Sequence, residues 1–135
     1  MALFDSLPEA EKAELERIET IIVDCAFKVH KAMGPGLLES VYERCMFHEM
    51  TKRGLKVRCQ VDLPIRYDDL YLESGLRLDM LVEEKIIVEN KAVERIIPVF
   101  DAQIISYLKL AKLFLGFRVN YHVVLIKDGI KRFIR

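Results

Sequence analysis

The sequence predicts an α/β fold in which helices flank a mixed central β-sheet as a sandwich. Apolar residues recur with the helical period near the N-terminus, and short runs rich in β-branched residues fill the middle and the end of the chain. Helical segments stand before, between and after these runs, which is typical of layered α/β proteins. With 52% hydrophobic residues, six glycines and four prolines, the 135-residue chain can bury a core and has no linker-like stretch. We therefore expect one domain over residues 1–135.

Three helices are expected. The first begins at the capping box Ser6-x-x-Glu9 and ends at Gly34. The second runs from about residue 37 to 52 and stops at a glycine, and the third occupies residues 99–113 after a proline. The first helix carries one apolar stripe, which consists of Ile18, Ile21, Ile22, Cys25, Ala26 and Val29.

The strands are identified by their apolar, β-branched-rich runs and by the turn residues between them. A hairpin is expected around Glu83-Glu84-Lys85, and the last two strands are expected to pair around Lys127-Asp128-Gly129. The expected strands span residues 56–61, 64–67, 76–82, 86–91, 117–126 and 130–134.

Three ionisable residues of the central hairpin should gather on one patch. A turn centred on Glu84 places Asp79 opposite Glu89, and directly opposed residues have Cβ atoms roughly 4.5–5.5 Å apart. Lys91 follows Glu89 by two positions, so both point to the same face while Asn90 points away. Two close carboxylates repel each other, and a bound hard cation would remove that cost. Mg²⁺ binds through one or two carboxylates plus water and phosphate oxygens, so the pattern suggests a metal-dependent phosphodiesterase centre. A solvated face with an ordinary salt bridge is the alternative interpretation.

Two helical segments add polar residues at helical spacing. Glu39 and Tyr42 share a face of the second helix, and Gln103 and Tyr107 share a face of the third. Each also has an ordinary interpretation: the tyrosines as packing residues with a hydrogen-bonded hydroxyl, Gln103 as a plain polar position, and Glu39 as a residue favoured by the helix dipole.

Taken together, these motifs resemble the GxxExxY family of the PD-(D/E)XK nuclease-like, or restriction-endonuclease-like, superfamily. The resemblance rests on Gly36-x-x-Glu39-x-x-Tyr42, on Asp79 with Glu89-x-Lys91, and on Gln103-x-x-x-Tyr107, in that order. It covers the chain from about residue 18 to the end, and leaves residues 1–16, the expected first part of the first helix, outside. Asn90 departs from the family, which more often has an apolar residue there.

The resemblance implies a restriction-endonuclease-like fold and a role for each motif residue. Asp79 and Glu89 resemble the two ligands of Mg²⁺ or Mn²⁺, and Lys91 resembles the catalytic lysine. Glu39 resembles the helical acidic residue that completes or orients the metal shell. Gln103 and Tyr107 match an element that positions substrate or active-site groups, and Tyr42 would support the site. The implied partner is DNA or RNA.

The remaining composition limits other functions. The chain has 21 basic and 21 acidic residues, so bulk charge does not favour polyanion binding and any nucleic-acid contact must be local. No signal peptide or membrane-length apolar run is present, which predicts a soluble, cytoplasmic protein. The cysteines and histidines lack metal-ligand spacing. Candidate phosphate contacts form two basic groups, Lys52, Arg53, Lys56 and Arg58, and Lys127, Lys131, Arg132 and Arg135.

Three functions are consistent with the sequence. The first is a Mg²⁺- or Mn²⁺-dependent nuclease acting on DNA or RNA. The second is a catalytically inactive nuclease-fold domain that binds nucleic acid or a protein partner. The third is a structural or oligomerising domain, in which the apolar segment Val119-x-Tyr121-x-Val123 would form an edge or a homodimer surface.

Overall fold

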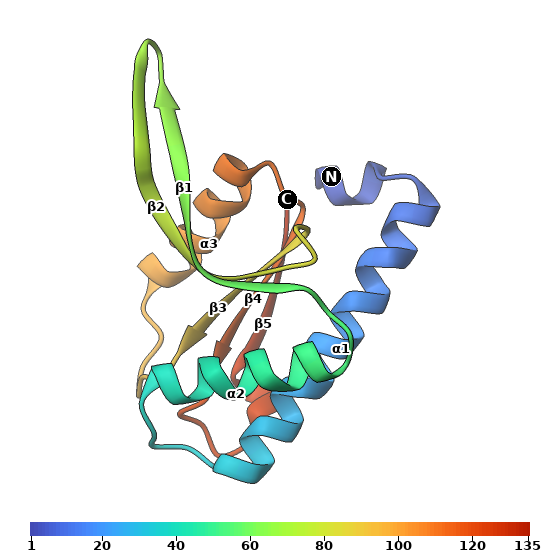
Figure 1. Cartoon of the computed structure of the whole chain (residues 1–135), viewed down its shortest axis with the longest axis vertical. Coiled ribbons are helices and arrows are strands. Elements are labelled where there is room, and N and C mark those ends of the chain that lie inside the picture. Colours follow the sequence, from blue (N-terminus) through green and yellow to red (C-terminus); the bar gives the residue numbers. More distant parts are fainter.

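A five-stranded mixed sheet forms the centre of the computed structural model, which describes all 135 residues (Figure 1). The strands lie in the order β1-β2-β3-β4-β5, and every neighbouring pair is antiparallel except β3 and β4, which are parallel. The parallel pair requires a crossover, which α3 provides. The elements are α1 (Glu9–Met33), α2 (Glu39–Lys52), β1 (Val57–Tyr67), β2 (Leu70–Val82), β3 (Ile86–Lys91), α3 (Pro98–Ala111), β4 (Leu115–Asn120) and β5 (Ile130–Ile134), with 3₁₀ turns at Leu3–Ser6 and Ile126–Asp128.

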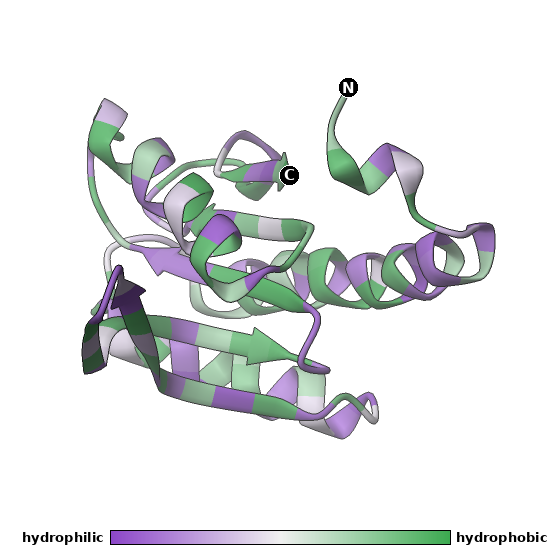
Figure 2. Cartoon of the chain, turned by 90° about the horizontal axis from the view of Figure 1, so that it is seen from above, coloured by the Kyte–Doolittle hydropathy of each residue, from purple (hydrophilic) through white to green (hydrophobic).

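Two separate cores hold the layers together. The larger joins the apolar stripe of α1 and the inner face of α2 to one side of the sheet, through residues such as Ile22, Met46 and Val88. The smaller joins α3 to the other side through Ile104, Leu108 and Ile87. Green and purple bands alternate along α1 (Figure 2), and its buried residues include Ile18, Ile22 and Cys25. The predicted α/β sandwich with a mixed sheet is confirmed, and none of the three α-helices has the length and apolar character needed to cross a membrane.

The predicted start of the first helix is wrong. Pro8, and not Ser6, occupies the N-cap position of α1, and no side chain caps the helix. Ser6 instead ends the 3₁₀ turn in which Phe4 is buried, and the Phe4 N–H donates to the Arg135 carbonyl at 2.6 Å. Burial of Phe4 and this link to the C-terminus outweigh the local capping signal, so residues 1–16 are only partly helical.

β1 is one continuous strand where two were predicted. The register shifts between Leu63 and Ile65, on either side of Pro64. Proline has no N–H to donate, and edge strands such as β1 accommodate it at an irregularity. Together with β2, which begins at Leu70 and not at residue 76, β1 forms a long hairpin that projects from the body of the molecule (Figure 1).

The predicted strand over residues 117–126 is also wrong after residue 120, where β4 ends. The Asn120 side chain bonds both backbone groups of Val93, at 3.1 and 2.9 Å, and the chain leaves the sheet there. Tyr121 then turns into the core, where it is fully buried beside the buried Val119. These two residues are therefore not available as the exposed edge or dimer surface that the apolar pattern suggested.

Candidate active site

The site is formed where the strands of the central hairpin separate. The predicted register is confirmed, because β2 and β3 pair at Val82 with Ile86 and at Met80 with Val88. Regular pairing stops there. The Asp79 N–H donates to Glu89 Oε2 at 2.8 Å, and the Asn90 N–H donates to Asp79 Oδ2 at 2.9 Å. Each carboxylate thus uses one oxygen to replace a backbone acceptor, which fixes the pair and leaves its second oxygen free of backbone donors.

Burial makes these two carboxyl groups unusually weak acids. Burial and then the charge of Asp79 raise the pKa of Glu89 to about 8, against the hydrogen bond from the Asp79 N–H and the charge of Lys91. Burial also raises the pKa of Asp79, against the hydrogen bond from the Asn90 N–H and the charge of Lys91. Two buried carboxyls side by side resist losing both protons, and a cation between them would reverse this.

Lys91 and Glu39 face the pair from two different elements. Lys91 ends β3, and its Nζ lies 4.5 Å from the centre of the Phe100 ring. Glu39 is the first residue of α2, and burial, followed by the charge of Asp79, raises its pKa, whereas Lys91 lowers it. The four predicted residues of the core motif therefore come within electrostatic reach of one another.

The two predicted site residues of α3, Tyr107 and Gln103, differ in their relation to the carboxylates. The pKa of Tyr107 is raised by burial and then by the charges of Glu89 and Asp79, so its hydroxyl lies within electrostatic reach of the pair. Gln103 is half-buried one turn earlier and makes no side-chain hydrogen bond. Of these two residues, only Tyr107 is linked to the carboxylates by an electrostatic effect.

Tyr42 supports the site from inside the core. It is fully buried, its hydroxyl donates to the Gly34 carbonyl at 2.5 Å, and it accepts from the Leu37 N–H at 3.0 Å. These bonds hold the turn that leads into Glu39, in which Gly34 and Gly36 have φ values of 70° and 96° that favour glycine. The spacing Gly-x-x-Glu-x-x-Tyr therefore describes one turn and the residue that anchors it.

Asn90 is part of the same support. It is fully buried and points away from the carboxylates, as the strand period predicts. Its Oδ1 accepts from the Tyr121 hydroxyl at 2.9 Å, and the Tyr121 ring stacks on Tyr42 with centroids 4.4 Å apart. The polar residue at this position, which looked like a packing defect in the sequence, is the acceptor for a buried hydroxyl.

Two residues of the site were missed in the sequence. Gln60 of β1 lies opposite Asp79, between the pairs Cys59 with Met80 and Val61 with Leu78. Its side-chain amide donates to Glu43 at 2.9 Å and lowers the pKa of Asp79. Glu43 follows Glu39 by one helical turn, so its helical spacing could have revealed it. Gln60 carries no comparable signal.

A bend in the long hairpin explains why Gln60 reaches the site. Cys59 and Met80 pack against the larger core, but Val61 and Leu78, two positions further on, belong to the smaller one. Residues two apart in a flat strand share a face. The strands therefore turn at Gln60 and Asp79, and Gln60 has a φ of 53°, which is uncommon for a residue other than glycine. Such distortions are frequent beside active sites.

The carboxylate oxygens of the site suit a hard divalent cation that takes only one or two ligands from the protein. No group of three or more histidine, cysteine, aspartate or glutamate side chains is placed to hold a metal together. Mg²⁺ needs only one or two protein carboxylates, with water and substrate completing its shell, and the free oxygens of Asp79 and Glu89 meet that requirement. Glu39 lies within electrostatic reach of the pair without forming a third direct ligand.

The pH dependence of stability tests this description of the carboxyls. The pKa of Glu89 rises from an ordinary value of 4.5 to about 8 on folding. Between these values the folded state holds more protons than the unfolded state, so the free energy of unfolding falls as the pH increases. We expect the melting temperature in chelator to fall between about pH 5 and about pH 8.5. Glu89→Gln should lose most of that slope, whereas Glu73→Gln, at an exposed residue of the hairpin, should retain it. Equal slopes in the two variants would contradict the assignment.

Comparison with known proteins agrees with this geometry. Residues 16–133 match the PD-(D/E)XK nuclease superfamily. No curated protein and no solved structure matches the chain. The mixed five-stranded sheet with its three helices is consistent with the restriction-endonuclease-like fold of that superfamily, whose nucleases typically use divalent metal ions. Because its fold agrees and the match spans most of its length, this chain belongs to the PD-(D/E)XK nuclease superfamily.

Proposed function

We propose that this protein is a Mg²⁺- or Mn²⁺-dependent nuclease that hydrolyses phosphodiester bonds in DNA or RNA, and that the whole chain forms one nuclease-like domain of the GxxExxY type. One observation carries the proposal: Asp79 and Glu89 each accept a hydrogen bond from the backbone of the other strand and keep a second oxygen, within electrostatic reach of Lys91. A hairpin with only a structural role would keep its backbone hydrogen bonds and would not bury two carboxyl groups in their place.

Asp79 and Glu89 would hold the metal, and Glu39 would orient its water ligands. A bound cation supplies charge neutralisation at phosphorus and a more acidic water. In the hydrolysis, a water oxygen forms a bond to phosphorus, the P–O bond to one sugar breaks, and the departing sugar oxygen takes up a proton. Lys91 would hold the attacking water and offset negative charge on the phosphoryl oxygens in the transition state.

The residues of α3 would act on the substrate. The Tyr107 hydroxyl lies within electrostatic reach of the carboxylates and would donate to a phosphate oxygen held there. Gln103, one turn away and without an internal hydrogen bond, is free to contact the same strand. Both are proposed as positioning residues.

The test is cleavage of labelled plasmid, linear duplex, single-stranded DNA and RNA with Mg²⁺, Mn²⁺ or chelator. We expect cleavage with metal, none with chelator, and loss of cleavage in Asp79→Ala. Asp69→Ala, in the exposed turn of the long hairpin, is the matched control and should cut normally. If the wild-type protein cuts none of these substrates while Asp79→Ala abolishes Mn²⁺ binding, the proposal fails in favour of an inactive, binding domain.

A further inference from the structure

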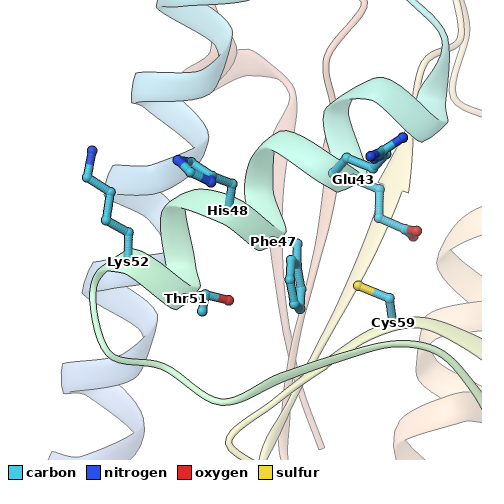
Figure 3. A pocket seen from close by; sticks show the side chains of 7 residues that line it. Glu43, Phe47, His48, Thr51, Lys52 and Cys59 are labelled. Atoms are coloured by element: carbon cyan, nitrogen blue, oxygen red, sulfur yellow. The ribbon is translucent and has the colours of Figure 1, made fainter.

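A groove of about 680 Å³ runs along α2 and is closed on one side by Cys59 of β1 (Figure 3). Its lining follows two neighbouring rows of α2, because residues four apart share a helical face. One row contains Glu43 and Phe47, and the other contains Arg44, His48 and Lys52. The groove therefore has an aromatic and a basic side running in the same direction.

The aromatic side is a single exposed ring. Phe47 is 41% exposed, and it projects from α2 toward β1, where Cys59 lies (Figure 3). Burial, followed by the charges of Glu43 and Asp79, raises the pKa of the Cys59 thiol to about 11, so this thiol is neutral near neutral pH. An aromatic ring exposed in a concave surface is a platform on which a planar group can stack.

The basic side consists of cations without partners. Neither Arg44 nor Lys52 forms an ion pair in this structure. Among the basic residues noted in the sequence, ion pairs join Arg53 to Asp24, Arg58 to Glu84, Lys131 to Asp101 and Arg132 to Glu19. Lys52 belongs to the same groups but keeps its charge unpaired, and together with Arg44 it gives the groove a positive side.

The groove adjoins the site through Glu43. Glu43 lines the groove and accepts the hydrogen bond from Gln60, which lies opposite Asp79. A strand bound along α2 would therefore approach the carboxylates from the side of Glu43 and Gln60.

We propose that this groove binds single-stranded nucleic acid, with one base stacked on Phe47 and the flanking phosphates contacted by Arg44 and Lys52. This inference rests on the proposed function, because the strand in the groove would be the substrate that leads to the carboxylates. Single strands are bound by this combination of aromatic faces and backbone cations. A duplex keeps its bases stacked on each other and cannot offer a base face to Phe47.

The test is binding of fluorescent single-stranded and duplex oligonucleotides in chelator, so that cleavage plays no part. Phe47→Leu should weaken single-strand binding about 5- to 100-fold, the range for loss of one stacked base, and leave duplex binding nearly unchanged. The double variant Arg44→Gln, Lys52→Gln should reduce the slope of log affinity against log salt by about 1.4, since each phosphate contact contributes about 0.7.

Matched controls are Tyr67→Leu, at an exposed ring on the projecting hairpin, and Lys109→Gln, at an exposed cation on α3. Unchanged single-strand binding in Phe47→Leu, or an equal loss for duplex, would overturn the inference, as would failure of the wild-type protein to bind single strands. The same preparations are assayed for cleavage with Mn²⁺. Cleavage with no effect of Phe47→Leu rejects the groove alone, and Phe47-dependent binding without cleavage rejects the nuclease activity alone.

Discussion

Lys91→Met should reduce metal-dependent cleavage by about two to three orders of magnitude and leave metal binding intact. The size of this effect is that of removing one preorganised group that stabilises charge in a transition state. Lys91 is the cation that lowers the pKa of Asp79, Glu89 and Glu39 together, so it lies where charge would develop on a phosphoryl group. The measurement is the single-turnover cleavage rate with saturating Mn²⁺, beside Mn²⁺ affinity by calorimetry.

Two variants make the interpretation specific. Lys109→Met removes an exposed lysine from α3 and should cut at the wild-type rate. Lys91→Arg keeps the charge but not the compact ammonium, and should recover only part of the activity. If Lys91→Met cuts within about threefold of wild type, a rate change far below that expected for a lost transition-state contact, Lys91 has no role in the chemistry.

Replacing Tyr42 should cause a large loss of stability. Tyr42→Ala should lower the free energy of unfolding by about 3–5 kcal/mol, because it removes a fully buried ring stacked on Tyr121. Tyr42→Phe keeps the ring and loses only the hydroxyl between Gly34 and Leu37. We expect it to cost about 1–3 kcal/mol, since both backbone groups lose their partner.

Denaturant unfolding of the metal-free protein measures both variants. Tyr71→Phe and Tyr71→Ala, at an exposed tyrosine of the projecting hairpin, are the controls and should change stability little. Tyr42→Phe should also reduce cleavage, because the turn before Glu39 loses its anchor. A Tyr42→Phe protein with wild-type stability would show that the hydroxyl does not hold this turn.

The hairpin could be predicted from sequence because its information is local. Strand periodicity and a three-residue connection determine which residues oppose each other, so the register that brings Asp79 near Glu89 follows from the chain alone. The long apolar stripe of α1 is local in the same way: five of its six predicted residues are buried, and Ile21 is half-buried.

Elsewhere, local signals were outweighed by distant contacts. The capping box at Ser6 was overridden by burial of Phe4 and its bond to Arg135. The predicted strand stops at Asn120, because Tyr121 packs in the core between Tyr42 and Asn90. Gln60 joined the site because β1 and β2 bend at its position, and no local pattern marks that bend.

The sequence by itself determined the α/β class, the central register and the motif residues Glu39, Asp79, Glu89 and Lys91. These depend on backbone periodicity and on side-chain chemistry, which each segment carries alone. Only the tertiary structure decided that the two carboxylates accept backbone hydrogen bonds where the strands separate. The tertiary structure also decided that Gln60 and Glu43 join the site and that Tyr42 anchors the turn before Glu39. These features arise from packing between segments far apart in the chain, where burial of a few large side chains outweighs the preferences of any one segment.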